Sequence, residues 1–154
     1  MIQSGDPNSK RAAAGVPLGD GGPAYDIPAE FRASLFHRKG VIAAAREGDA
    51  VNPQKQSSAS QFYIVQGRIF SDAGLDSAET RTKRKIPPAQ REVYKTIGGT
   101  PHLDQNYTVF GEVVKGLDVV DKIAAVETSK NMDRDRPISD VRIIKARLVK
   151  RKKR

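Results

Sequence analysis

The fold is decided by Ser60-Gln61-Phe62-Tyr63-Ile64, taken together with Tyr107-Thr108-Val109-Phe110-Gly111. Successive side chains of a strand point to opposite faces, so Phe62 and Ile64 are expected in a core while Gln61 and Tyr63 point outward. An amide beside an aromatic ring on an outward face indicates an apolar pocket with one hydrogen-bonding wall. Such a pocket suits a peptide bond next to a proline-like ring.

Other stretches in the same order resemble the cyclophilin-type peptidyl-prolyl isomerases: Met1-Ile2-Gln3-Ser4-Gly5-Asp6-Pro7, Gly19-Asp20-Gly21-Gly22-Pro23, Ile27-Pro28-Ala29-Glu30-Phe31, Gly40-Val41-Ile42-Ala43-Ala44-Ala45-Arg46 and Pro101-His102-Leu103-Asp104. The resemblance covers most of the chain and departs across roughly Gln66 to Gly99. It implies a mainly β fold, an antiparallel cyclophilin-like barrel with one or two helices. It also implies a peptidyl-prolyl cis-trans isomerase that acts on X-Pro bonds and assists protein folding.

The 154 residues suit one domain. We expect a cyclophilin-like domain over 1–149, with an insertion over about 66–99, and a basic tail over 150–154. Cyclophilins usually have about two strands and a helix before the stretch that Met1 matches, so the resemblance implies an N-terminally incomplete barrel, from a truncated gene model or a fragment. The localisation is therefore left open between the cytoplasm and, if a missing upstream segment carries a signal, the periplasm.

The same comparison places the family's key arginine, the donor to the proline nitrogen, upstream of Met1. Arg38, in Phe36-His37-Arg38, superficially copies that motif. It falls just before the strand that begins at Gly40, on the wrong side of the Gly-Gly loop, so we do not assign it a catalytic role.

Composition and pattern give the expected elements. Buried strands are predicted over Gly40–Ala45 and Ser60–Gln66, another strand over Thr108–Val114, a closing strand over Val141–Val149, and a short strand or turn over Ile27–Arg32. Helices are predicted from Pro88 through Ala89–Thr96, stopped by Gly98-Gly99, and over Asp118–Val126. Loops are expected over Asn8–Tyr25, Arg46–Ala59 and Asp133–Pro137, and Gly67–Lys85 shows only a charged, weakly apolar pattern. The insertion is interpreted as a solvated decoration in preference to a partner-binding arm.

Charge and composition exclude several classes of site. The chain has no cysteine and two histidines, which excludes disulfides and a cysteine nucleophile and argues against structural zinc. No cofactor, metal or membrane span is expected. The net charge of +9 includes the tail Lys150 to Arg154, which we interpret as a solvated terminus. Nucleic acid is not an expected partner, because the body lacks interleaved aromatic and basic residues.

The resemblance also assigns site residues. Gln3 and Gln61 match the family's substrate-facing glutamines and are the predicted catalytic residues. The predicted substrate-binding residues are Met1, Tyr63 and Leu103 in the proline pocket, the backbone of Ala45-Arg46, Gly19 in the loop of a neighbouring pocket, and His102 and Tyr107. In an unrelated fold Gln61 would be an exposed polar residue, Tyr63 a packing aromatic and His102 an ordinary loop histidine. For His102 and Tyr107 both interpretations stay open.

The expected partners are proline-containing polypeptide segments, bound by a monomer. Cyclosporin-like ligands are left open, because His102 replaces the large ring that many sensitive relatives present. Two other functions remain as alternatives. One is a non-catalytic module that binds proline peptides, and the other is a nucleic-acid or anionic-surface binder that works through the basic tail.

Overall fold

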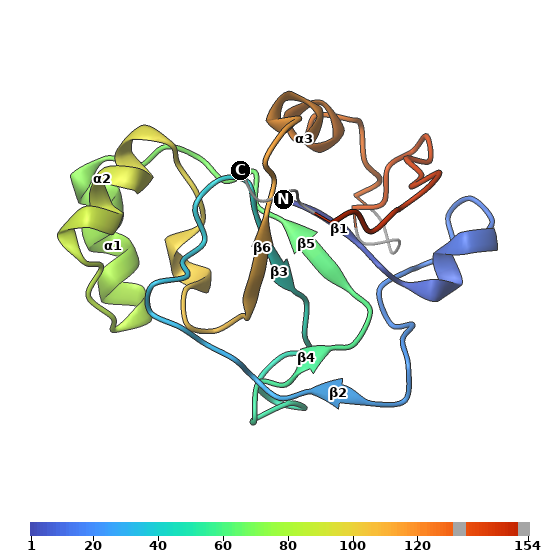
Figure 1. The fold of residues 1–154 in the computed structure, drawn as a ribbon, viewed down its shortest axis with the longest axis horizontal. Helices are drawn as coiled ribbons and strands as arrows, with labels where there is room; N and C mark the ends of the chain where they lie inside the picture. The colour runs from blue at the N-terminus through green and yellow to red at the C-terminus, as the bar shows by residue number, and fades with distance from the viewer. Residues whose placement is uncertain (131–134, 151–154) are drawn as a thin grey trace.

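The computed structural model describes residues 1–130 and 135–150. Within them the fold is mainly β with antiparallel sheets, as the sequence predicts, and it has three α-helices where one or two were expected. A four-stranded sheet has the order β1 (Ile2–Ser4), β5 (Phe62–Ile64), β3 (Val41–Ala44) and β6 (Val109–Glu112). A smaller sheet pairs β2 (Asp26–Ile27) with β4 (Ser57–Ser58) at one end of it (Figure 1).

The register of the large sheet aligns residues from three strands. Tyr63 on β5 lies opposite Gln3 on β1 and opposite Ala43 on β3. Because residues directly opposite each other share a face, these three side chains form a row across the sheet. The register between β3 and β6 shifts between Ile42 and Ala43, which is the local irregularity expected of a bulge.

The core of the sheet lies on the face that the sequence pattern predicted to point outward. Tyr63 is 2% exposed and belongs to a cluster with Val41, Ala43, Ala45, Val65 and Val109. Leu103 and Tyr107 pack over this cluster. Gln61 is buried as well, whereas Phe62 and Ile64 are only partly covered. The predicted facing was therefore wrong, because the segment after Pro101 covers the Tyr63 face.

The insertion is a helical hairpin with a core of its own. It contains α1 (Asp72–Thr82), which the charged pattern did not predict, and α2 (Pro88–Thr96), which was predicted. Both lie together beside the sheet (Figure 1). Leu75, Ala78, Ile86 and Tyr94 are buried, with Phe36 and Phe70 packed against them. The interpretation as a solvated decoration is therefore wrong, because Tyr94 is fully buried and anchors the hairpin.

α1 has a recognisable N-terminal cap but buries only two residues, which explains its weak sequence pattern. Ser71 caps the helix by accepting a hydrogen bond from the backbone N–H of Gly74, which is the usual role of serine at that position. Leu75 and Ala78 are the buried residues of this helix, so it shows little hydrophobic periodicity. After α2, Gly98 has φ of +86°, the left-handed conformation that glycine adopts readily.

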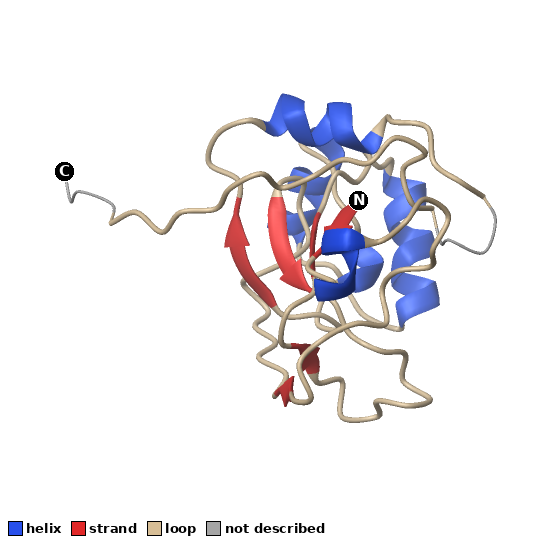
Figure 2. Ribbon diagram, turned by 90° about the vertical axis from the view of Figure 1, so that its right-hand side faces the viewer, coloured by secondary structure: helices blue, strands red, loops and turns tan. Residues whose placement is uncertain are grey.

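Among the remaining elements, the predicted loops Asn8–Tyr25 and Arg46–Ala59 each include part or all of a short element that the sequence did not predict, the first a 3-10 helix and the second β4. α3 (Leu117–Ala124) occupies the predicted second helix, and short 3-10 helices span Pro7–Arg11 and Pro101–Leu103. The predicted strand Val141–Val149 is instead extended coil that runs out from the body (Figure 2). No described strand lies beside this segment, so its backbone groups lack the partner that a strand requires. The side chain of Leu148 is accordingly fully exposed.

Among the described residues β1 pairs only with β5 and β6 only with β3, so these two strands are the edges of the large sheet. The expected barrel is thus represented by an open antiparallel sheet within those residues. Part of the predicted loop Asp133–Pro137 and the tail beyond Lys150 lie outside the described residues.

Candidate functional site

The candidate site begins with a buried carboxylate that organises a glycine-rich loop. Asp6 follows β1, and its Oδ2 accepts hydrogen bonds from the backbone N–H groups of Gly19 (2.6 Å) and Gly21 (3.3 Å). Its Oδ1 accepts from the N–H of Asn8 at 2.7 Å. Burial alone would raise the pKa of Asp6, but these backbone donors outweigh it and hold the pKa below its ordinary value.

Gln61 holds the other side of the same loop. Its Nε2 donates to the carbonyl oxygens of Gly19 (2.8 Å) and Gly21 (2.7 Å), and its Oε1 accepts from Nε2 of Gln3 at 3.1 Å. A primary amide has two N–H donors, so both donors of Gln61 are used within the chain. Gln61 therefore positions the loop, and the exposed amide of Gln3 is the more accessible of the two side chains.

Both glutamines line a cavity of about 370 Å³. Gly19 and its neighbours in the loop line this cavity, and so do Ala45 and Arg46. The lining also includes the acidic residues Asp20, Asp26 and Glu47. The structure thus brings Gln3, Gln61, Gly19, Ala45 and Arg46 together around one hollow.

The backbone groups of Ala45 are hydrogen-bonded within the protein, whereas those of Arg46 have no backbone partner among the described residues. The N–H of Ala45 donates to the carbonyl of Gln61 at 3.0 Å, and its carbonyl accepts from the N–H of Ser58 at 2.8 Å. Among the backbone hydrogen bonds of the described residues, none uses the N–H or C=O of Arg46. These groups are available to an extended peptide, since each is an obligatory hydrogen-bonding group.

The side chain of Arg46 fixes the segment that carries Tyr107. Its Nε donates to the carbonyl of Asn106 at 2.8 Å, and its guanidinium lies 4.6 Å from the centre of the Tyr107 ring. It also pairs with Asp49 at 2.7 Å. A guanidinium over an aromatic face is attractive and orients the ring.

An aromatic cluster lies next to this segment. The rings of Tyr63 and Tyr107 meet edge to face, with 5.7 Å between their centres. Leu103 packs against the same core. The hydroxyl of Tyr63 lies 2.9 Å from Nε2 of the fully buried His37, and burial raises the pKa of Tyr63 above its ordinary value. Tyr63, Leu103 and Tyr107 are therefore brought together, with Tyr63 forming the base of the cluster.

Two predicted residues belong neither to the cavity lining nor to the aromatic cluster. Met1 precedes β1 and is half exposed, and His102 is exposed in the 3-10 helix Pro101–Leu103. Desolvation lowers the pKa of His102, assisted by the positive charge of Arg81. For both residues, substrate contact stays a prediction.

Sequence reasoning missed three buried polar residues that organise the site. Asp6 and Asp104 lie within stretches that resemble the family, and His37 lies in Phe36-His37-Arg38, which we did not count as a match; none of the three was assigned a role. The signal was present, since an aspartate or histidine inside an otherwise apolar or glycine-rich motif is usually buried only with hydrogen-bond partners. Arg38, which we had set aside, forms an ion pair with Glu112 of β6.

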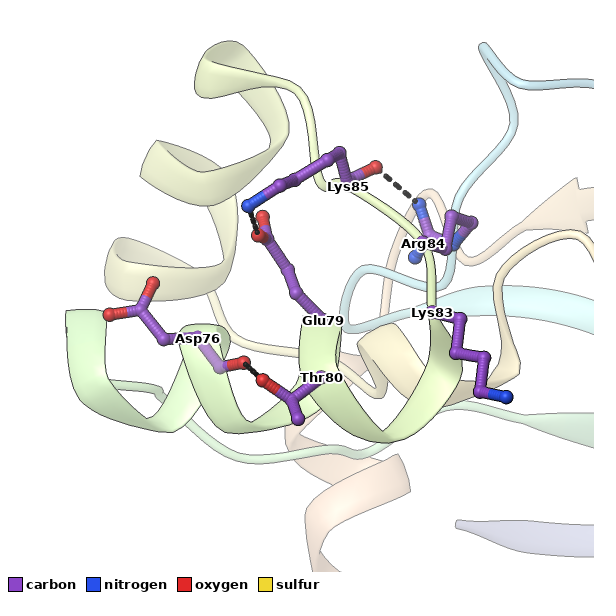
Figure 3. A pocket seen from close by; sticks show the side chains of 6 residues that line it. All are labelled: Asp76, Glu79, Thr80, Lys83, Arg84 and Lys85. Carbon is purple, nitrogen blue, oxygen red and sulfur yellow. Dashed lines mark hydrogen bonds and ion pairs between the residues drawn. The ribbon is translucent and has the colours of Figure 1, made fainter.

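A second cavity, of about 320 Å³, lies on the hairpin and is lined by charged residues. Figure 3 shows Lys85 reaching back to Glu79, a pair 2.8 Å apart. Glu79 also accepts from Arg91 at 3.2 Å and from the N–H of Ile86 at 2.9 Å. The Glu79 carboxylate is thus committed to internal partners that close the hairpin.

Within residues 1–130 and 135–150, no group of three or more histidine, aspartate or glutamate residues could hold a metal ion. In the same described ranges, no helix is long and apolar enough to cross a bilayer. The chemistry that the site offers is hydrogen bonding, aromatic packing and shape.

Comparison with known proteins gives one consistent result. The family model "Cyclophilin type peptidyl-prolyl cis-trans isomerase/CLD" matches residues 1–148. Over 143 residues the chain is 31% identical to a "Putative peptidyl-prolyl cis-trans isomerase" of Staphylococcus saprophyticus, covering 93% of this chain and 64% of that protein. A Staphylococcus aureus protein of the same name is 32% identical over 141 residues, covering 92% and 63%.

A third relative is longer. The "Putative bifunctional phosphatase/peptidyl-prolyl cis-trans isomerase" of Streptococcus pyogenes is 33% identical over 143 residues, which is 92% of this chain and 27% of that protein. The chain therefore spans less than two thirds of the length of each of these relatives.

Proposed function

The chain belongs to the cyclophilin-type peptidyl-prolyl cis-trans isomerases, and from this premise we propose that it accelerates the cis/trans isomerisation of X-Pro bonds in polypeptide segments. The uncatalysed rotation faces a barrier of about 20 kcal/mol, while the isomers differ by only about 0.5–1 kcal/mol. A catalyst of this reaction needs no nucleophile or cofactor. It needs to bind the twisted amide better than either planar form.

The observation that carries the proposal is that Arg46, whose backbone groups are unused within the described residues, lines the same cavity as the hydrogen-bonded glutamines Gln3 and Gln61. The unused N–H and C=O of Arg46 are proposed to hydrogen-bond the backbone of the substrate residue before proline, as neighbouring strands of a sheet bond to each other. Gln3, steadied through Gln61, supplies an exposed amide beside that backbone. Leu103 and Tyr107, which are partly buried and pack over Tyr63, are proposed to supply the apolar surface for the proline ring, with Tyr63 as its support.

In this proposal Gln3 and Arg46 contact the substrate, and Gln61 and Gly19 shape the wall against which it lies. Holding the flanking backbone while the proline ring rests on an aromatic surface restricts the substrate to geometries near the twisted amide. Met1 and His102 are proposed as outer contacts of the same pocket. The proposed substrates are proline-containing segments, bound by a monomer, and cyclosporin-like ligands are a further candidate for the same surface.

The test is two-dimensional exchange NMR on a short Ala-Pro peptide with catalytic amounts of the chain. We expect cross-peaks between the cis and trans forms to grow faster with the chain, and more slowly with Gln61→Ala. Gln54→Ala, a change at an exposed glutamine, is the matched control and should leave the rate unchanged. A folded chain whose amide signals shift with the peptide, yet which gives no faster exchange, would overturn the proposal in favour of binding without turnover.

A further inference from the structure

A chain of buried polar groups runs from the inserted hairpin to the aromatic cluster. Tyr94 of α2 donates its hydroxyl to Asp104, with oxygen–oxygen distances of 2.9 and 2.8 Å. Asp104 lies 3.0 Å from Nδ1 of His37, and Nε2 of His37 lies 2.9 Å from the hydroxyl of Tyr63. Each of these four residues is at most 2% exposed, so water contributes little to the connection.

Asp104 is the centre of this chain. Besides Tyr94 and His37 Nδ1, it accepts from the backbone N–H of His37 at 2.7 Å and from Nη2 of Arg84 at 2.8 Å. A buried carboxylate is tolerated only where donors and an opposite charge surround it. Arg84, in the connection between α1 and α2, supplies that charge. The hairpin therefore supplies two of the groups that allow Asp104 to be buried.

The direction of the hydrogen bonds follows from the partners. In the neutral tautomer of His37 whose Nδ1–H donates to the Asp104 carboxylate, Nε2 is the acceptor. The hydroxyl of Tyr63 then donates to Nε2, which fixes the rotation of that hydroxyl and the position of the ring edge. Burial raises the pKa values of both Tyr63 and Tyr94, so both phenols stay protonated and can donate.

This series of hydrogen-bonded side chains ends at Tyr63, in the proposed proline pocket. The Tyr63 ring contacts Tyr107 edge to face and stacks on His37 with 6.0 Å between ring centres. Asp104 directly follows Leu103, which packs on the same core. A shift of Asp104 would therefore move the pocket from two sides, through the Tyr63 ring and through the segment that carries Leu103 and Tyr107.

We propose that the α1–α2 hairpin is a positioning element of the proline pocket, with Tyr94 and Arg84 as positioning residues that act through Asp104 and His37 on Tyr63. Its catalytic consequence rests on the proposed isomerase function. The hairpin touches no substrate in this scheme. It determines how rigidly the aromatic floor is held, and so how well the pocket discriminates the twisted amide from the planar one.

The experiment compares Tyr94→Phe, Tyr63→Phe and the double variant. Tyr25→Phe is the matched control, since Tyr25 is 65% exposed and outside the chain of polar groups. In Tyr94→Phe, Asp104 keeps its donors from His37 and Arg84, so the fold should persist. We expect the maximal rate of Ala-Pro exchange to fall about 3- to 10-fold, the effect of one buried hydrogen bond, with little change in half-saturating peptide concentration. We expect the double variant to lose little more than either single variant.

A second measurement does not depend on activity. In a protein with ¹³C-labelled tyrosine rings, Tyr94→Phe should shift the ring signals of Tyr63 and Tyr107, whereas Tyr25→Phe should leave them in place. Arg84→Gln, which acts on the same carboxylate without altering a buried ring, should shift the same signals and gives a second test if Tyr94→Phe unfolds.

The outcomes separate the two proposals. Unshifted Tyr63 and Tyr107 signals in Tyr94→Phe and Arg84→Gln, or losses in rate that multiply independently, would overturn the positioning role. Shifted ring signals together with no exchange by the unmodified chain would support the connection and overturn the isomerase function instead.

Discussion

The side-chain amide of Gln3 on β1 donates to the side-chain carbonyl of Gln61, the residue that precedes β5, at 3.1 Å. Because the amide of Gln61 is in turn committed to the carbonyls of Gly19 and Gly21, the two glutamines and the glycine-rich loop form one hydrogen-bonded unit. Gln3 is the end of this unit that lies exposed at the cavity. A change at Gln61 should therefore act on the site through the loop.

Gln61→Glu tests this arrangement with nearly no change in size. The variant replaces an amide nitrogen by a carboxylate oxygen that faces the carbonyl oxygens of Gly19 and Gly21. Two donors are therefore lost, and the negative carboxylate is repelled by the partial negative charge of the carbonyl oxygens. We expect the free energy of unfolding to fall by about 2 kcal/mol or more, and the amide signals of the 19–23 loop to move. Urea denaturation and ¹H–¹⁵N spectra measure both effects. Gln54→Glu should change neither, and an equal effect there would refute a specific role for Gln61.

Asp6→Asn should destabilise the same unit from the opposite side. The amide of the variant presents a donor to backbone N–H groups that are donors themselves, so we expect a loss of about 1–3 kcal/mol at neutral pH. The folded-state pKa of Asp6 is lowered, so its stabilising contribution is present above the unfolded value of about 3.9 and is lost as pH falls through the folded value. The difference between Asp6→Asn and the unmodified chain should therefore shrink as the pH is lowered below about 4.

Thermal unfolding at pH 7 and at several values below pH 4 measures this difference. Asp26→Asn, a change at an exposed strand position, serves as the control. A difference that stays constant on acidification would show that the carboxylate charge of Asp6 does not stabilise the loop.

Glu79→Gln tests how the hairpin is closed. The Lys85 ammonium, the N–H of Ile86 and the Arg91 guanidinium hold the pKa of Glu79 at about 2. Its stabilising contribution should therefore be complete above the unfolded value of about 4.3 and be lost as pH falls toward 2. We expect Glu79→Gln to melt at a lower temperature than the unmodified chain at pH 6 and to converge with it near pH 2. Glu92→Gln, at a more exposed position, should show a smaller difference; equal differences would contradict the role of Glu79.

Much of the architecture could be predicted from local sequence. The strand at Val41–Ala44 has small and β-branched residues, and α2 has a proline at its start and glycine after its end, so local chemistry determined both. The facing of Tyr63 could not be predicted in this way. Alternation shows that Tyr63 and Phe62 point to opposite sides, but only the distant segment with Leu103 and Tyr107 determines which side is covered.

The candidate site shows the same division. Gln3, Gln61 and Gly19 were predicted by resemblance, and the structure places them around one cavity. The internal use of both Gln61 donors depends on carbonyl groups about 40 positions away in the sequence, which no local pattern reveals. The connection from Tyr94 to Tyr63 depends on one contact between residues 10 positions apart and on two between residues 67 and 26 positions apart. It begins at Tyr94 in the insertion, where the resemblance gave no guidance.

Gly99→Ala tests the junction between the hairpin and the sheet. Gly99 exchanges backbone hydrogen bonds with Arg68, and a β-carbon at this position would lie 2.2 Å from the carbonyl oxygen of His37 and 2.7 Å from the ring of Tyr94. Neither neighbour can move freely, since the first is backbone and the second is a fully buried ring. We therefore expect a loss of about 2 kcal/mol or more of unfolding free energy, the cost of overpacking a dense interior.

Urea denaturation of Gly99→Ala beside Gly48→Ala provides the measurement. A β-carbon at Gly48 would meet nothing within 4 Å, so that variant should stay within about 0.5 kcal/mol of the unmodified chain. Because the clash at Gly99 lies between His37 and Tyr94, the ring signals of Tyr63 should also shift in Gly99→Ala. A variant as stable as Gly48→Ala would show that the hairpin does not pack on the sheet as closely as these contacts require, and would remove the physical basis for transmission from Tyr94 to the pocket.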